Sequence, residues 1–195
     1  ISDVRIVKGT AVYTSNFTAP TERLTAVTNT SLLTCHLPYI ADGSTTGHSI
    51  SVNGGAHTLP FAPYDAAEYT NSSHLGSVHL DGTGDYLSIP DGTWKTFGTG
   101  DWTIEAYIYT YNAAKRQYLF SDINSGGSNN TSSVLLYLDG GVVKCYIQDT
   151  TYNLITGSTS ITAKTWHHVA VVRNGTTVTL YLDGKSQGTY SIGSG

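Results

Sequence analysis

The chain has 195 residues and a formal net charge of −4, and it contains no cluster of Lys or Arg residues. This charge distribution argues against a nucleic-acid partner, because phosphate backbones are bound by clustered basic side chains. No apolar run approaches the roughly 20 residues that cross a bilayer, which argues against membrane insertion. With 21 Gly, 14 Tyr and no Met, the composition is poor in strong helix formers and suits one large all-β domain.

The first strongly patterned element in chain order lies at residues 97–109. Residues 98–101, Gly-Thr-Gly-Asp, form a turn sequence that leads into it. Ile104, Ala106 and Ile108 then fall on one face of an extended segment, while the residues between them fall on the other. This alternation predicts a β-strand with one apolar face.

A first hairpin is predicted in the middle of the chain. Residues 134–138 and 142–147 are two apolar, strand-like stretches. The sequence between them, Asp139-Gly140-Gly141, is typical of a tight turn that joins two antiparallel strands.

A second hairpin is predicted at residues 166–184. Its strands alternate apolar and polar side chains with a period of two. Asn174-Gly175 is expected to be a two-residue turn with positive φ angles, and Asp183-Gly184 repeats the same signal at the far end.

This hairpin sequence resembles a known family. Trp-His-His-Val-Ala followed by an Asn-Gly turn and Leu-Tyr-Leu-Asp-Gly is similar to the laminin G-like members of the concanavalin A-like lectin/glucanase superfamily. The blocks at 78–87 and 97–109 resemble the start of such domains. The resemblance implies an all-β fold, namely an antiparallel two-sheet jelly-roll β-sandwich, and it leaves function partly open.

The resembling pieces occur in permuted order. Residues 1–20 are similar to the closing segment of tandem laminin G-like domains in tailed-bacteriophage structural proteins, where that segment follows the hairpin. Residues 21–77 resemble a linker and the first strands of the next copy, and residues 78–195 resemble the main body of the sandwich. The N-terminal segment is therefore expected to supply the closing strands.

Those closing strands have two candidate positions. They could complete the sandwich of their own chain, which residues 21–77 are long enough to permit, or they could complete a neighbouring subunit and polymerise the protein. We favour closure within the chain. The apolar side chains expected to make the contact are Ile1, Val4, Ile6, Val7, Val12, Tyr13 and Phe17.

The sequence lacks the carboxylate pattern of a glucanase. Retaining glucanases of this superfamily typically carry Glu-x-Asp-x-Glu on one strand face, because nucleophile and acid must flank one glycosidic bond. Here Glu105 is followed by Ala106 and Tyr107, so the second and third carboxylates are missing. We interpret Glu105 as a strand residue that faces solvent or caps a loop, and we predict that the chain is not an enzyme.

Metal binding has one candidate loop. Asp81 and Asp85 frame a Gly-Thr-Gly sequence, and their carboxylates could converge on calcium. The favoured alternative is a turn in which the two Asp side chains bond the local backbone. His167 and His168 are adjacent in a strand, so their side chains lie on opposite faces and cannot chelate one ion. We expect that the chain requires no cofactor, with calcium as the one possible ligand of this kind.

Two cysteines, Cys35 and Cys145, lie in apolar, strand-like surroundings. They could form one disulfide across the sandwich, but an isolated Cys is more often a small buried hydrophobe. We favour the second interpretation.

Tyrosine is the remaining candidate for ligand chemistry. Sugar rings stack on exposed aromatic faces while nearby amides and carboxylates bond the hydroxyls; alternatively, Tyr is simply a good strand residue whose ring lies on the sheet. The sequence favours neither. The candidate carbohydrate-binding residues are Tyr107, Tyr109, Tyr111, Tyr118, Asn129, Asn130, Asp149 and Tyr152.

These observations predict a non-catalytic structural module of a virion or cell surface that recognises glycans or host-surface polysaccharide. It would be part of a fibre or decoration protein and gain affinity from multivalency. One alternative is an extracellular filament protein that self-associates by strand complementation, and a glycoside hydrolase is the least favoured alternative. The expected location is the virion surface or the extracellular space.

Overall fold

The computed structural model describes residues 1–64, 76–92, 97–122, 133–148 and 152–192. These residues form fourteen β-strands and no helix. All strand pairs among them are antiparallel. The prediction of an all-β chain is confirmed.

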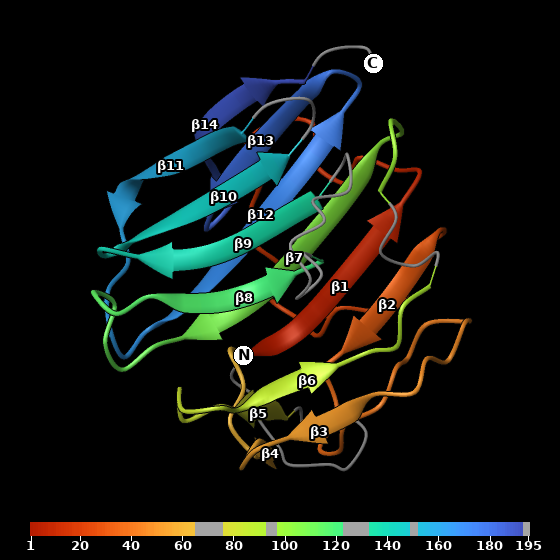
Figure 1. Ribbon diagram of the computed structural model, residues 1–195, viewed down its shortest axis with the longest axis vertical. Helices are drawn as coiled ribbons and strands as arrows, with labels where there is room; N and C mark the ends of the chain where they lie inside the picture. Colours follow the sequence, from red (N-terminus) through yellow and green to blue (C-terminus); the bar gives the residue numbers. More distant parts are fainter. Residues whose placement is uncertain (65–75, 93–96, 123–132, 149–151, 193–195) are drawn as a thin grey trace.

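Six strands form the largest sheet (Figure 1), in the spatial order β14 (Lys185–Ser191), β13 (Thr177–Leu182), β12 (Trp166–Asn174), β7 (Trp102–Tyr109), β1 (Ser2–Lys8) and β2 (Thr30–Thr34). The strand predicted within residues 97–109 is β7, which pairs with β12 on one side and β1 on the other. The first strand of the chain therefore lies inside this sheet.

Four strands form the second sheet, in the order β11 (Tyr152–Ser160), β10 (Val142–Gln148), β9 (Ser133–Asp139) and β8 (Gln117–Ser121). Figure 1 shows this sheet in front of the six-stranded one, with its strands crossing those behind. The two layers make the antiparallel β-sandwich of the jelly-roll type that the sequence predicts.

Two short pairs of strands complete the described fold at the lower end of Figure 1. β3 (Ser51–Asn53) pairs with β6 (Tyr86–Ser88), and β4 (His57–Leu59) pairs with β5 (Ser77–His79). They enclose a small second core beside β1 and β7, formed by Val4, Cys35, Ala56, Val78 and Ala106.

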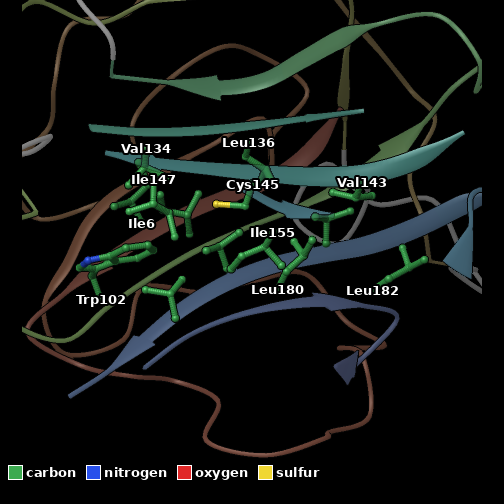
Figure 2. Packing of buried hydrophobic residues seen from close by; sticks show 14 of the residues in the cluster. Ile6, Trp102, Val134, Leu136, Val143, Cys145, Ile147, Ile155, Leu180 and Leu182 are labelled. Carbon is green, nitrogen blue, oxygen red and sulfur yellow. The ribbon is translucent and has the colours of Figure 1, made fainter. Parts of the chain in front are cut away.

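The main core lies between the two large sheets and follows from strand alternation (Figure 2). On β9, Val134, Leu136 and Leu138 are buried, whereas the residues between them are partly exposed. Cys145 lies in this core and Cys35 in the smaller one, and both are free thiols. The two cysteines are therefore small buried side chains and not a disulfide pair.

Two turns lie where the sequence predicts them. Gly140 and Gly141 have φ angles of 64° and 84° and join β9 to β10. Asp183 and Gly184 have φ angles of 48° and 75° and join β13 to β14. Both are two-residue hairpin turns with two positive φ angles, as the right-handed twist of the flanking strands requires.

The turn between β12 and β13 is shifted by one residue from its predicted position. Asn174 pairs with Thr177, so Gly175 and Thr176 are the two turn residues. Gly175 has a φ of 60°, and its N–H donates to the Asp101 carboxylate at 2.7 Å. A glycine in the first turn position suits the hairpin, and the tertiary bond to Asp101 fixes the turn there.

The N-terminal segment closes the sandwich of its own chain. Ile6 and Val7 of β1 are completely buried, Val4 is 9% exposed, and Ile1 packs against both cores. The backbone of Ile1 exchanges hydrogen bonds with Val78. β1 therefore occupies the intramolecular position that the sequence analysis favours.

Residues 9–20, which we call the N-terminal strap, run over the outer face of the six-stranded sheet. Tyr13 and Phe17 stack with ring centroids 3.6 Å apart. They pack on a small apolar cluster of the sheet, formed by Ala170, Val172 and Tyr181. The N–H of Val12 donates to the Thr103 hydroxyl at 2.9 Å. Both faces of the six-stranded sheet are therefore covered in this region.

Candidate carbohydrate-binding surface

The outer face of the four-stranded sheet carries a group of aromatic and charged side chains. Tyr118 on β8 lies opposite Tyr137 on β9, which in turn lies opposite Lys144 on β10. Because the neighbours of Tyr137 point into the core, Tyr137 itself points outward. Arg116 and Asp139 lie at the end of the same strands, and we call these five residues the Tyr118 platform.

The two tyrosine rings form the aromatic part of the platform and are tilted by 41° to each other. Tyr118 is 59% exposed, and its ring centroid lies 6.0 Å from that of Tyr137. The guanidinium carbon of Arg116 lies 5.6 Å from the Tyr137 ring centroid, within cation–π range. The surface therefore offers an open aromatic ring beside a stacked cation.

The charged part of the platform is organised around one carboxylate. Asp139 accepts hydrogen bonds from Nε and Nη2 of Arg116, at 3.2 and 3.1 Å, and from Nζ of Lys144, at 2.8 Å. The hydrogen bonds from Arg116 and then from Lys144 lower the pKa of Asp139 to about 2. Two cations thus surround one ionised carboxylate, which leaves one positive charge in excess.

The loop before β8 is held against the neighbouring turn, and it carries Arg116. The N–H groups of Gly140 and Gly141 donate to the carbonyls of Ala114 and Ala113, respectively. These hydrogen bonds hold the backbone that carries Arg116 against the β9–β10 turn, which limits the conformational entropy that the platform would lose on binding a ligand.

A second aromatic group lies at the end of β7 and β12, and we call it the Trp166 cluster. It consists of Phe61, Tyr109, Tyr111 and Trp166. The Phe61 ring lies 4.9 Å from Tyr109 and 5.1 Å from Trp166, and Tyr109 lies 5.6 Å from Tyr111. Tyr111 is 65% exposed and Phe61 is 42% exposed. Two of the candidate tyrosines, Tyr109 and Tyr111, therefore belong to this cluster.

Tyr107 belongs to neither surface. It is 6% exposed, its hydroxyl donates to the carbonyl of Pro20 in the strap, and burial raises its pKa. Its ring is covered, so it presents no free face to a sugar.

For the other four predicted carbohydrate-binding residues, the structure gives no side-chain position that bears on either surface. Asn129, Asn130 and Asp149 lie outside the described residues. Tyr152 is the first residue of β11, where its backbone pairs with Gln148.

The Asp81 and Asp85 loop is a hydrogen-bonded turn. Asp85 accepts from the backbone N–H groups of Asp81 and Gly55, at 2.8 and 2.5 Å. Asp81 accepts from the N–H of Thr83 at 2.6 Å. Within the described ranges, no three His, Cys, Asp or Glu side chains are placed to hold a metal ion. The carboxylates thus bond the local backbone, and calcium binding here stays a prediction.

The comparison with protein families identifies this fold. The model described as the concanavalin A-like lectin/glucanases superfamily matches residues 81–195, more than half of the chain. The chain belongs to this superfamily. No curated protein matches it.

Solved structures agree with the superfamily assignment. The binding domain of Paraclostridial Mosquitocidal Protein 1 is 15% identical with a TM-score of 0.59, and the match covers 80% of this chain and 40% of that one. Two point variants of HCR/D have TM-scores of 0.55 and 0.57, at 16% and 15% identity, over 79% and 83% of this chain and 37% and 39% of theirs. The chain thus spans about 40% of these relatives or less, and at such identity the likeness concerns the fold.

The superfamily includes glucanases, which makes the position of Glu105 informative. The prediction that Glu105 faces solvent or caps a loop is wrong, since this side chain is completely buried. Its Oε1 accepts from Nε and Nη2 of Arg5, at 2.9 and 2.6 Å. Its Oε2 accepts from the Tyr13 hydroxyl at 2.8 Å and lies 3.0 Å from Nε2 of His168. The N-terminal strap covers this face, which the local sequence of β7 does not reveal.

The electrostatics of Glu105 follow from these contacts. Burial by itself would raise its pKa, but the hydrogen bond with His168 and the charge of Arg5 outweigh burial and hold the pKa below its usual value. The carboxylate is therefore ionised and saturated with partners that lie on three other segments of the chain.

Six residues of the two surfaces are not predicted as site residues from the sequence, namely Arg116, Tyr137, Asp139, Lys144, Phe61 and Trp166. The alternation of residues 133–139 was a usable signal, because it places Tyr137 opposite to the apolar face. The contact of Phe61 with Trp166 has no such signal, since it joins segments that are distant in the sequence.

In the part of the chain that the structure describes, there is no helix with the length and apolarity needed to cross a membrane.

Proposed function

We propose that this chain is a non-catalytic carbohydrate-binding module that contacts glycans at the Tyr118 platform. The observation that carries the proposal is the exposed Tyr118 ring beside Tyr137, flanked by hydrogen-bonding groups on a rigid sheet. A sugar ring can stack on such an aromatic face, while Arg116, Asp139 and Lys144 bond its hydroxyls.

The state of Glu105 supports binding without turnover. A glycosidase needs a carboxyl pair that flanks the scissile bond, whereas both oxygens of Glu105 are bonded to protein groups beneath the strap. The superfamily description contains lectins, and one solved neighbour is named a binding domain. Both are consistent with a recognition role.

The wider setting is also a proposal. A surface or extracellular position suits a glycan-binding module, and the resemblance of residues 1–20 to bacteriophage structural proteins favours a virion fibre or decoration protein. The division into 1–20, 21–77 and 78–195 belongs to the same proposal. Repeated copies would turn weak single contacts into useful avidity.

A glycan array followed by calorimetric titration tests the proposal. We expect binding, and we expect Tyr118→Ala to weaken it about tenfold, the effect of losing roughly 1.4 kcal/mol of stacking and contact energy. Tyr86→Ala is the matched control, because Tyr86 is 55% exposed but lies on β6. Unchanged binding in Tyr118→Ala would contradict the proposal.

The Trp166 cluster is the second candidate surface, supported by the exposure of Tyr111 and Phe61. Tyr111→Ala separates the two sites in the same titration. If this variant loses binding while Tyr118→Ala retains it, the glycan is held at the end of β7 and β12.

A further inference from the structure

The charges of the Tyr118 platform favour one class of sugar. Asp139 faces the Nε and Nη2 edge of Arg116. The Nη1 end of this planar group therefore points away from that carboxylate, and the side chain is 56% exposed. Lys144 donates to the same carboxylate at 2.8 Å, and its side chain is 20% exposed. The platform thus holds two cations, of which Arg116 is well exposed, next to the open ring of Tyr118.

The local charge of the platform is positive, whereas the chain as a whole is negatively charged. The whole protein has a net charge of −4 and only 10 Lys and Arg residues. Two of those ten lie together here, around a single carboxylate that the two of them keep ionised. A neutral sugar needs no such surplus charge, whereas an acidic sugar is attracted by it.

We propose that the Tyr118 platform selects acidic saccharides, in which a carboxylate is attached to the sugar ring. The ring would stack on Tyr118, and the carboxylate would bind the exposed Nη1 end of Arg116, on the side away from Asp139, with Lys144 adding positive charge. A guanidinium presents parallel N–H groups that match a carboxylate, which gives such pairs both strength and orientation. This inference rests on the proposed function, since it concerns the same site.

The experiment compares acidic glycans with neutral partners of the same architecture. The probes are 3′-sialyllactose against lactose, and a galacturonic acid trimer against its carboxyl-reduced form. We expect each acidic member to bind about tenfold more tightly at about 20 mM salt, and this advantage to shrink at about 500 mM salt as the charges are screened. The affinity of the neutral members should not depend on salt.

Variants then locate the preference. Arg116→Gln and Lys144→Gln should each weaken binding of the acidic member more than binding of the neutral one, so that the ratio of the two affinities falls toward one. Lys185→Gln is the matched control, because it removes the same charge from an exposed position on β14. Thermal unfolding curves confirm that each variant is folded, and the salt dependence of the unmodified chain provides an independent test.

The outcomes separate the inference from the proposed function. If acidic and neutral sugars bind equally and Tyr118→Ala weakens both, the acidic preference is overturned and the proposed function stands. If the preference survives both Arg116→Gln and Lys144→Gln, its placement on the platform is overturned. If no sugar binds, both proposals are overturned.

Discussion

Glu105 is the residue whose environment differs most from what its neighbours in the sequence indicate. It lies in the central strand β7 and is contacted by Arg5 from β1, Tyr13 from the strap and His168 from β12. A buried ion pair of this kind contributes little net energy compared with an apolar pair, but the loss of one partner is costly. The network therefore makes the N-terminal segment hard to displace.

Replacing this carboxylate should destabilise the fold. We expect Glu105→Gln to lower the free energy of unfolding by about 3 to 5 kcal/mol, because the charge of Arg5 is then left buried without its counter-ion. Urea denaturation measures the change, and Glu22→Gln, at an exposed position, is the control. A difference below about 1 kcal/mol would show that the network does not hold the segment.

Asp3 predicts a specific pH dependence of stability. Its carboxylate is buried, and it accepts from the Ser2 hydroxyl and from the Leu24 N–H. Burial raises its pKa from 3.8 to about 6, although both hydrogen bonds oppose the shift. The folded state thus binds this proton more tightly than the unfolded state, so the contribution is present below pH 3.8 and lost as the pH rises through about 6.

The comparison with Asp3→Asn isolates this effect from all other titrations. Relative to that variant, the unmodified chain should lose about 2 kcal/mol of stability between pH 4 and pH 7. Urea denaturation of both proteins at both pH values gives the stability difference between them at each pH, and hence its change with pH. If the difference between the two proteins were independent of pH, the carboxyl of Asp3 would not titrate in this range.

At the scale of elements, the strap and the β13–β14 turn are fitted to each other. The Phe17 N–H donates to the Gly184 carbonyl at 2.9 Å, and the Ser186 N–H donates to the Asn16 side chain at 2.9 Å. A Cβ atom on Gly184 would lie 1.9 Å from the Phe17 carbonyl oxygen. Glycine is therefore required here both by its positive φ and by the close approach of the strap.

Two glycines with positive φ, Gly175 and Gly184, separate the effect of the backbone angle from that of the close approach. Gly175→Ala should cost about 1 kcal/mol, because its φ is positive but no atom lies near the added methyl group. Gly184→Ala should cost about 2 kcal/mol more, since the strap must also move. Hydrogen exchange checks the mechanism: only the second variant should speed exchange at the Phe17 amide, and equal effects would contradict the fit.

At the scale of the whole molecule, β1 joins parts of the chain that would otherwise be separate. It pairs with β7 on one side and β2 on the other, and Ile6 contributes to the main core. Without it, β7 would present an unpaired edge beside a partly open core, which is a template for association.

Truncation tests this role. The full chain should be monomeric in light scattering, because its own strand fills the sheet. A chain that begins at residue 21 should aggregate or unfold, and adding a peptide of residues 1–20 should restore a monodisperse complex. Polymers of the full chain would instead favour strand exchange between subunits, and a stable monomer without residues 1–20 would show that β1 is dispensable.

The fold was largely predictable because its signals are local. The alternation at residues 103–108, the Gly140-Gly141 turn and the Asp183-Gly184 turn each depend on a few neighbouring residues, and the structure contains all three. The Gly175 turn was predicted one residue too early because its position depends on the distant Asp101.

The candidate site was predictable only in part. Composition and loop context predict Tyr118 and Tyr107 alike as ligand contacts, but Tyr118 is exposed and Tyr107 is buried. Period-two alternation says which residues share a face, but it does not say whether that face is covered.

Local sequence patterns thus predict the strands β7, β9, β10, β12 and β13, two of the tight turns and the superfamily resemblance, because these follow from side-chain alternation and from residues that tolerate positive φ. Only the tertiary structure decided that the strap buries Glu105 and that β8, β9 and β10 align Tyr118, Tyr137 and Lys144 on one open face. Both depend on strand register and on contacts between segments far apart in the chain, and no local pattern encodes them.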